Sequence, residues 1–317
     1  MREQPITSVV VAGGGIIGWS AAAALKRRLP ALSVAVIAIE PAANALADHM
    51  VCTLPSIVDF HQDLGLSEAD TVLRAGSGYR LGTQFEGWAD ADYVHAYGSI
   101  GASFGSAAFH QYWLRAAEAG VAAPFESYSA AAMIARNGRF ASPEAVARAG
   151  LGTIGYGLHI DPPRYREMMR AFALHLGATE IPGAISEVRL SSGDGSIESV
   201  LAGDREIAAD LYVDATGPDA LLRSRLDDQW EDWSEWLSAD RALIARSGSP
   251  AEPSLLDTAV AIPGGWRWRA AAPGRTSCGL VYSSQRLTDS EASRILSENA
   301  SAVAPEAPVA IRQGRWS

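Results

Sequence analysis

The chain has 317 residues, of which 48% are hydrophobic and 20% charged, and its formal net charge at pH 7 is −10. So much apolar sequence excludes an intrinsically disordered chain, because it can bury a sizeable core. The acidic balance excludes a nucleic-acid groove or an anionic membrane surface as the main partner, since both attract clustered positive charge. Two cysteines, Cys52 and Cys278, are too few for a disulfide framework or a four-cysteine zinc site, and they fit a reducing cytoplasm.

The first predicted elements lie within an uncharged stretch, residues 6–25. By length alone this stretch could span a membrane or form the core of a signal peptide. Four glycines interrupt it, and its basic residues follow it, whereas the basic flank of a signal peptide comes first. We therefore predict a buried strand over residues 8–12, a glycine turn and a helix over residues 19–29.

The turn between this strand and helix has the spacing Gly-x-Gly-x-x-Gly, and its candidate binding residues are Gly13, Gly14, Gly15, Ile17 and Gly18. The first glycine permits a sharp bend, the second lets backbone amides approach a pyrophosphate, and the third lets the helix pack closely on the strand. The helix N-terminus adds partial positive charge. The next apolar run ends in Glu40, 22 residues after Gly18, where a carboxylate can accept a hydrogen bond from a ribose hydroxyl. These features predict a βαβ unit that binds a dinucleotide.

Residues 49–155 show a looser, glycine- and aromatic-rich pattern, with one helix expected near residues 106–119. We expect this region to be an insertion that covers a ligand. A helix over residues 163–176 follows, with proline in its first turn.

Three apolar runs come next, over residues 184–190, 196–202 and 206–213, separated by turns that contain glycine. They predict an antiparallel meander. The third run continues into Asp214-Ala215-Thr216-Gly217, and this arrangement resembles the two-part FAD site of the glutathione-reductase and aromatic-hydroxylase families. The resemblance implies that Asp214 and Gly217 lie on the far side of the cofactor. An NAD(P)-dependent dehydrogenase, in which the later turn is a coincidence, stays open.

Two further patterns concern single residue types. Trp230, Trp233 and Trp236 have the spacing of one helix face. Basic residues comprise 25 arginines and one lysine, Lys26, which we expect on a solvated face of the first helix. Six scattered histidines show no i, i+4 pair with a third ligand, so no metal site is expected.

Several segments in one order carry a closer resemblance: Gly18-Trp19, Leu54-Pro55, Tyr79-Arg80, Phe85-x-x-Trp88, residues 109–114, His159-Ile160-Asp161, Trp266-x-Trp268 and residues 279–284. This order is similar to that of the flavin-dependent tryptophan halogenases, over essentially the whole chain. The resemblance implies an α/β fold: an FAD-binding Rossmann-like domain of the glutathione-reductase type, with an antiparallel meander and an inserted substrate region.

The resemblance also implies a division of the chain. Residues 1–225 would form the FAD-binding core, with residues 49–155 inserted as a substrate-covering region, and residues 226–317 would form a partial substrate or C-terminal region. Family members are considerably longer, so a chain that ends at Ser317 is expected to be C-terminally shortened.

In this family a separate NADH-dependent flavin reductase supplies reduced FAD, which reacts with oxygen to a hydroperoxide. Halide then gives hypohalous acid, which travels to a lysine beside an aromatic substrate. Here Arg80 stands at the position of that lysine, and arginine stays charged and is a weak nucleophile. His95 and Tyr97 match family positions around the substrate ring, which implies a stacking site for an indole or phenol.

The expected function is therefore an FAD-binding oxidoreductase of the monooxygenase-like halogenase group, with a small aromatic substrate. The alternative is a catalytically inactive, shortened remnant that binds flavin. The absent lysine favours this alternative, and so do residues 49–53, which replace a Gly-Glu-x-Thr cluster of the family.

Overall fold

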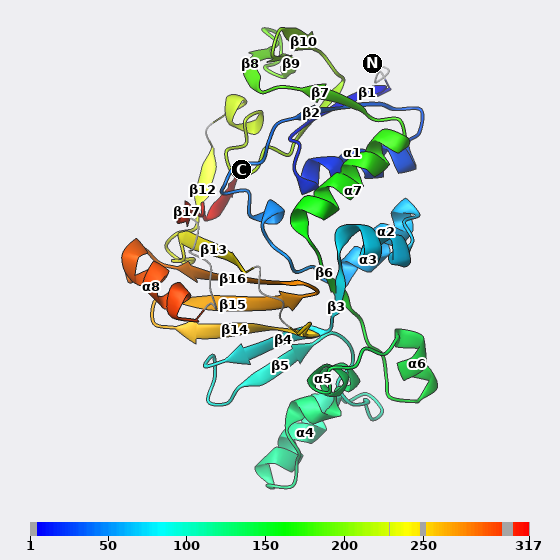
Figure 1. Ribbon diagram of the computed structural model, residues 1–317, viewed down its shortest axis with the longest axis vertical. Coiled ribbons are helices and arrows are strands. Elements are labelled where there is room, and N and C mark those ends of the chain that lie inside the picture. The colour runs from blue at the N-terminus through cyan, green and yellow to red at the C-terminus, as the bar shows by residue number, and fades with distance from the viewer. Residues whose placement is uncertain (1–4, 228, 248–251, 300–306, 317) are drawn as a thin grey trace.

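The computed structural model describes residues 5–227, 229–247, 252–299 and 307–316. The expectation of a C-terminally shortened chain concerned Ser317, which lies outside these ranges. A small parallel sheet with a meander forms one end of the molecule, and a larger sheet lies beyond it (Figure 1).

The parallel sheet has the strand order β11-β1-β2-β7. Its strands are β1 (Ser8–Ala12), β2 (Ser33–Ala38), β7 (Thr179–Pro182) and β11 (Leu211–Asp214). Helices α1 (Ile16–Arg28) and α7 (Pro162–His175) pack together on one face. The predicted strands and both helices are confirmed, although α1 begins three residues before its predicted start, so that Gly18 lies inside the helix.

The meander covers the other face of the parallel sheet. It comprises β8 (Ile185–Leu190), β9 (Ile197–Ala202) and β10 (Arg205–Ile207). Val10 and Ile37 of the parallel sheet share a buried cluster with Val200 of the meander. This layered arrangement leaves the carboxyl ends of the parallel strands accessible at one edge.

The third run of the meander is not one strand, which corrects the prediction over residues 206–213. It divides at residues 208–210, so that β10 pairs antiparallel with β9 whereas β11 pairs parallel with β1. The Asp210 carboxylate fixes this change of sheet, because it accepts hydrogen bonds from the backbone N–H of Thr7 and of Ser8. Hydrophobic alternation alone does not show where a chain leaves one sheet for another.

The larger sheet has seven strands in the order β17-β13-β16-β15-β14-β4-β5. They are β4 (Gly82–Glu86), β5 (Tyr93–Ala96), β13 (Arg241–Ser247), β14 (Leu256–Ile262), β15 (Gly265–Ala272), β16 (Arg275–Tyr282) and β17 (Val309–Ala310). Helix α8 (Asp289–Asn299) packs on it through Ala292 and Leu296. Strands from the inserted region and from residues 226–317 therefore share one sheet, and the boundary at residue 225 stays a prediction.

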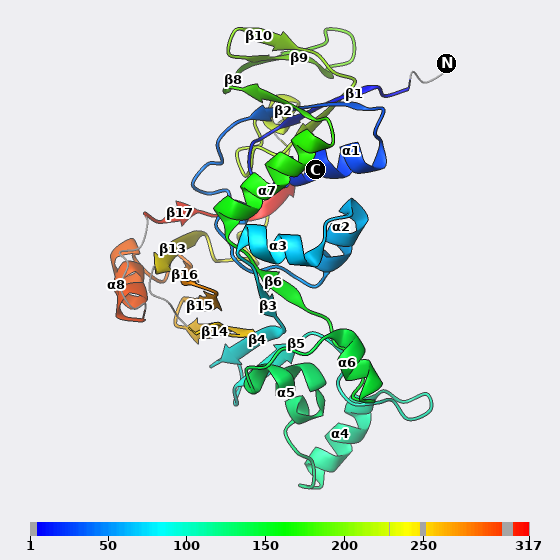
Figure 2. The same ribbon diagram turned by 45° about the vertical axis from the view of Figure 1, so that its right-hand side comes forward.

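The remaining elements connect and flank the two sheets. They are α2 (Ser56–Leu64), α3 (Glu68–Ala75), β3 (Gly78–Arg80), α4 (Phe109–Glu118), α5 (Ala130–Arg136), α6 (Pro143–Arg148), β6 (Gly157–His159), β12 (Trp230–Asp232), β18 (Gly314–Trp316), and the short turns η1 (Leu46–Asp48), η2 (Phe125–Tyr128) and η3 (Arg223–Arg225). The helix predicted near residues 106–119 is confirmed as α4, which projects from the end opposite to the meander (Figure 2).

Two sequence expectations are wrong. Trp230 does not begin a helix, because it lies in β12, which pairs with β18 and places its ring edge-on to that of Trp316. Lys26 does not lie on a solvated face, because its Nζ is buried and donates hydrogen bonds to the carbonyls of Pro30 and Leu32. In both cases the partner lies outside the predicted helix: Trp316 is distant in sequence, and Pro30 and Leu32 lie beyond the end of α1.

Across the part of the chain that the structure describes, no helix combines the length and the apolarity needed to cross a bilayer. The uncharged residues 6–25 instead form β1 and most of α1.

His61 of α2 generates a prediction on pH and stability. Its ring is buried, with Nε2 2.8 Å from the Tyr165 hydroxyl, and burial lowers its pKa from 6.5 to about 4. Below about pH 6.5 the unfolded chain therefore binds a proton that the folded chain does not, so the free energy of unfolding falls as the pH falls toward 4. This group contributes a loss of about 3 kcal/mol. We expect His61→Gln, which does not titrate, to lose correspondingly less in urea unfolding across this window; equal pH dependence of the two proteins would contradict the assignment.

Candidate functional site

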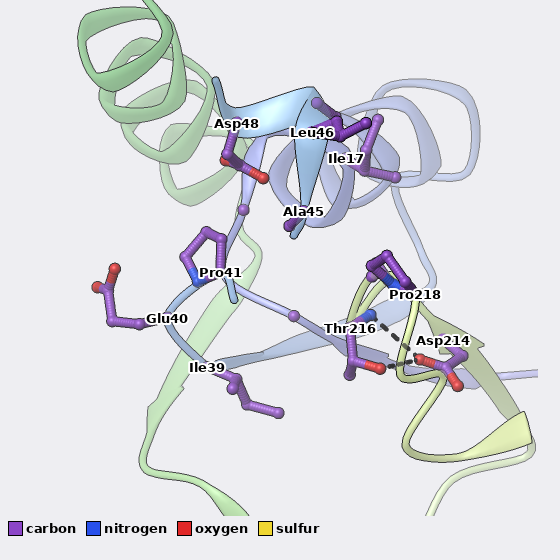
Figure 3. A pocket seen from close by; sticks show the side chains of 15 residues that line it. Ile17, Ile39, Glu40, Pro41, Ala45, Leu46, Asp48, Asp214, Thr216 and Pro218 are labelled. Atoms are coloured by element: carbon purple, nitrogen blue, oxygen red, sulfur yellow. Dashed lines mark hydrogen bonds between the residues drawn. The ribbon is translucent and has the colours of Figure 1, made fainter. Parts of the chain in front are cut away.

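A pocket of about 260 Å³ lies where β1, β2 and β11 end. We call it the glycine pocket, and its lining residues are Gly13, Gly15, Ile17, Ile39, Glu40, Pro41, Ala45, Leu46, Ala47, Asp48, Asp214, Ala215, Thr216, Gly217 and Pro218. Figure 3 shows Asp48 on one side of the pocket and Thr216 on the other. Ligands of open α/β sheets bind at this carboxyl edge.

The glycine turn is held in place by close backbone packing. A Cβ on Gly13 would lie 2.2 Å from the carbonyl oxygen of Ala215, and Gly13 has a φ of +125°, a region that favours glycine. A Cβ on Gly18 would lie 1.9 Å from the carbonyl oxygen of Gly13. Gly14 and Gly18 do not line the pocket, and close packing explains their place in the motif: a Cβ on Gly14 would lie 2.9 Å from the carbonyl oxygen of Ile39, just after β2.

Asp214 lines the pocket but its oxygens are already engaged. They accept hydrogen bonds from the N–H and hydroxyl of Thr216, and from the backbone N–H of Leu222 and of Arg223. The carboxylate thus shapes the turn that follows β11 and presents Gly217 to the pocket. We assign Asp214 a positioning role toward a ligand.

Glu40 lies at the edge of the pocket with a largely exposed carboxylate. Oε2 accepts a hydrogen bond from Nη1 of Arg166 at 3.0 Å. Its other oxygen, Oε1, remains geometrically available to a ribose hydroxyl. Arg166 is a neighbour that the sequence pattern did not indicate, because it lies 126 residues further along the chain.

FAD fits the donor set of the glycine pocket. Gly15 brings no side chain to the start of α1, and α1 has no acidic residue in its first turn. Glu40 and the turn at Gly217 line the same pocket as this helix start. Asp48, which no sequence pattern indicated, also reaches the helix start, with Oδ1 2.8 Å from the backbone N of Ile16.

A second pocket, of about 230 Å³, lies against one face of the seven-stranded sheet. We call it the aromatic pocket, and it is lined by Met50, Cys52, Arg80, Thr83, Phe85, Trp88, Asp257, Thr258, Ala259, Trp266 and Trp268. Strand register explains the grouping, because Ala259 pairs with Phe85 on one side and with Trp268 on the other. Three of its rings form a chain, with centroids 5.8 Å apart for Phe85 and Trp88 and 6.4 Å apart for Trp88 and Trp266.

Arg80 is buried beside this pocket and its guanidinium is held by four groups. Nε donates to the Asp257 carboxylate, and Nη1 donates to the carbonyl of Thr53 at 2.8 Å and to the Tyr97 hydroxyl. Nη2 donates to Oγ1 of Thr83 at 2.9 Å. Arg80 is thus a fixed cation in contact with Tyr97, and the contact of either residue with a substrate stays a prediction.

Asp257 neutralises this cation. Its Oδ1 also lies 2.6 Å from Nε2 of His159. Burial opposes ionisation of Asp257, yet contacts with His159 and Arg80 lower its pKa below the usual value. Burial likewise disfavours the charge of Arg80, but Asp257 raises the pKa of Arg80. The pair is therefore ionised and, as a unit, neutral.

Cys52 completes the polar cluster. Burial and the nearby Asp257 carboxylate raise the pKa of its thiol well above the usual value, so the thiol stays protonated. Donor atoms of Cys52, His159 and Asp257 lie within 4.8 Å of one another, a grouping that can ligate metals. The Arg80 guanidinium already supplies the positive charge that Asp257 needs, and it would repel a metal cation at this place.

His95 and Tyr97 lie side by side, but their rings are perpendicular, at an interplanar angle of 90° with centroids 6.3 Å apart. His95 is exposed, and neither residue lines the aromatic pocket. Their contact with a substrate stays a prediction.

The Arg80–Asp257 pair generates a prediction on stability. Asp257→Asn leaves a buried cation without its counter-ion, which costs about 3–5 kcal/mol of unfolding free energy. Arg80→Met conversely leaves the buried Asp257 carboxylate without its cation. The double variant removes both charges, so we expect its loss to be smaller than the sum of the two single losses by about 1–3 kcal/mol. Urea unfolding of the four proteins measures this coupling, and additive losses would show that the ion pair does not act as a unit.

Comparisons with known proteins agree with this geometry. Residues 8–317 match the family model described as tryptophan halogenase. Tryptophan 7-halogenase RebH from Lentzea aerocolonigenes is 27% identical in an alignment that covers 91% of this chain and 58% of RebH. The chain thus spans well under two thirds of the length of this relative.

Two solved structures have the same fold. The flavin-dependent halogenase Xcc4156 from Xanthomonas campestris matches with a TM-score of 0.88 and 34% identity, over 98% of this chain and 62% of that one. The flavin-dependent halogenase BrvH from Brevundimonas sp. BAL3 matches with a TM-score of 0.90 and 31% identity, over 98% and 64%. These matches confirm the predicted α/β fold with an FAD-binding Rossmann-like domain, and they favour FAD over the NAD(P) alternative. The chain belongs to the tryptophan halogenase family, and FAD is its cofactor.

Proposed function

We propose that the glycine pocket binds FAD and that the chain acts as an oxidoreductase on a small aromatic substrate, which it halogenates or hydroxylates with reduced FAD and oxygen. One observation carries the proposal: the glycine turn after β1, Glu40 after β2 and the Asp214–Gly217 turn after β11 line a single pocket. A dinucleotide needs these three elements together, for its pyrophosphate, its ribose and its far side.

The partners follow from the family. A separate NADH-dependent flavin reductase would supply reduced FAD, and halide would be the co-substrate of a halogenation. The free thiols of Cys52 and Cys278 support a reducing, cytoplasmic setting.

In this proposal the backbone amides at Gly15 and at the start of α1 hold the pyrophosphate, and Glu40 holds the adenosine ribose. Asp214 keeps the turn at Gly217 in a shape that approaches the cofactor. Bound reduced FAD would supply the two electrons that activate oxygen.

The aromatic pocket supports a flat, uncharged substrate. Phe85, Trp88, Trp266 and Trp268 offer ring faces and edges for stacking. Among the described residues that line it, only Arg80 and Asp257 are charged, and they neutralise each other. The indole N–H of Trp268 is buried and has no hydrogen-bond partner among the described residues.

Arg80 cannot supply the amine of the family mechanism, because it stays protonated and its donors are engaged. Its proposed role is positioning: it orients the Tyr97 hydroxyl and holds Asp257 at the pocket wall. His95 lies next to Tyr97 and would contact the substrate edge.

A second candidate function is flavin binding without turnover. The engaged guanidinium of Arg80 is the observation that favours it, since no lysine lies in the aromatic pocket among the described residues. The two candidates differ in whether product forms.

The test supplies the protein with a flavin reductase, NADH, FAD, bromide or chloride, catalase and a panel of indoles and phenols. We expect halogenated or hydroxylated product by mass spectrometry, absent when the protein is omitted. Phe85→Ala should lower kcat/KM roughly tenfold through loss of ring contacts. The matched control Phe104→Ala removes an exposed ring outside the pocket and should leave the rate unchanged. FAD binding without any product would select the second candidate.

A further inference from the structure

Asp48 is the feature of the glycine pocket that a dinucleotide site does not require. It ends the short turn η1 and belongs to the pocket wall formed by residues 45–48. Its Oδ1 accepts a hydrogen bond from the backbone N–H of Ile16 at 2.8 Å. A Cβ placed on Gly15 would lie 2.5 Å from its Oδ2, so the carboxylate occupies the space next to this glycine.

This position is the one that a pyrophosphate takes in a dinucleotide site. The first N–H groups of a helix have no partner within the helix, and together with the helix dipole they attract an anion. The capping residue Gly15 offers no side-chain acceptor, and the first turn of α1 has no acidic residue. A carboxylate 32 residues along the chain therefore satisfies a helix start that a phosphate would otherwise satisfy.

We propose that Asp48 is an internal competitor for the pyrophosphate of FAD. Both anions need the N–H of Ile16 and the space over Gly15, so the carboxylate and its turn move away when the cofactor binds. Asp48 thereby lowers the affinity for FAD. The inference rests on the cofactor of the proposed function and not on its reaction.

The test separates the charge of Asp48 from its hydrogen bond. Asp48→Asn keeps an oxygen that accepts from the N–H of Ile16 but removes the negative charge. Like charges a few ångströms apart repel, so at low salt we expect the dissociation constant for FAD to fall roughly tenfold, with a smaller gain at high salt. Quenching of tryptophan fluorescence measures it.

Two further ligands and one control variant show whether the change in affinity depends on the phosphates. ADP, which carries a pyrophosphate without a flavin, should gain the same factor as FAD. Riboflavin, which carries no phosphate, should bind both proteins equally. Asp204→Asn removes the same charge at an exposed position between β9 and β10, away from the pocket, and should leave all three affinities unchanged.

An unchanged or weaker affinity of folded Asp48→Asn for FAD and ADP would overturn the proposal and leave the cofactor assignment intact. An equal gain in affinity for riboflavin would also overturn the proposal, because riboflavin has no phosphate that the charge of Asp48 could repel. If neither wild type nor variant binds FAD or ADP, both this inference and FAD binding in the glycine pocket are wrong.

Discussion

The backbone contact between Gly13 and Ala215 is the constraint on which the cofactor site depends. β1 lies between β2 and β11, and its end is fixed on both sides, by a hydrogen bond from Gly13 N–H to the carbonyl of Ile37 and another from Ala215 N–H to the carbonyl of Ala12. No side chain fits between the two turns, since a Cβ on Gly13 would collide with Ala215. Glycine at position 13 lets the turn after β1 and the turn after β11, about 200 residues apart in sequence, line one pocket. The meander stabilises the sheet that carries both turns, because it packs on the face opposite to α1 and α7.

A second constraint, electrostatic rather than steric, organises the aromatic pocket. Arg80 of β3, Asp257 of β14 and His159 of β6 form one buried cluster, and Thr53 adds a backbone carbonyl. An amine could exchange a proton in such a site, but a guanidinium paired with a carboxylate stays charged and rigid. Arg80 therefore provides a fixed positive charge at the aromatic pocket and no amine that can lose a proton.

Local patterns predicted the parts of the structure that local interactions determine. The glycine spacing, the apolar runs around it and the proline-started helix gave β1, α1, β2 and α7, because turn geometry and burial of short apolar strands act over a few residues. The division of the third meander run, the strand at Trp230 and the buried environment of Lys26 depend on partners outside the segment itself. No local sequence pattern indicated that Asp257 or Asp48 belongs to a site, because their hydrogen-bond partners are 177 and 32 residues away in sequence.

The measurement that tests the account most directly is a titration of the protein with FAD, in parallel with the variant Gly15→Val. Gly15 has a φ of −79°, so valine strains no backbone, but its side chain would fill the space over the helix start. We predict saturable binding of one FAD per wild-type chain and at least about 100-fold weaker binding by a folded variant, a difference that corresponds to about 2.7 kcal/mol. Gly193→Val, in an exposed turn where a Cβ would make only an ordinary contact, 3.6 Å from Oγ of Ser191, is the control and should bind as wild type does. Undiminished FAD binding by Gly15→Val would contradict the placement of the cofactor in the glycine pocket.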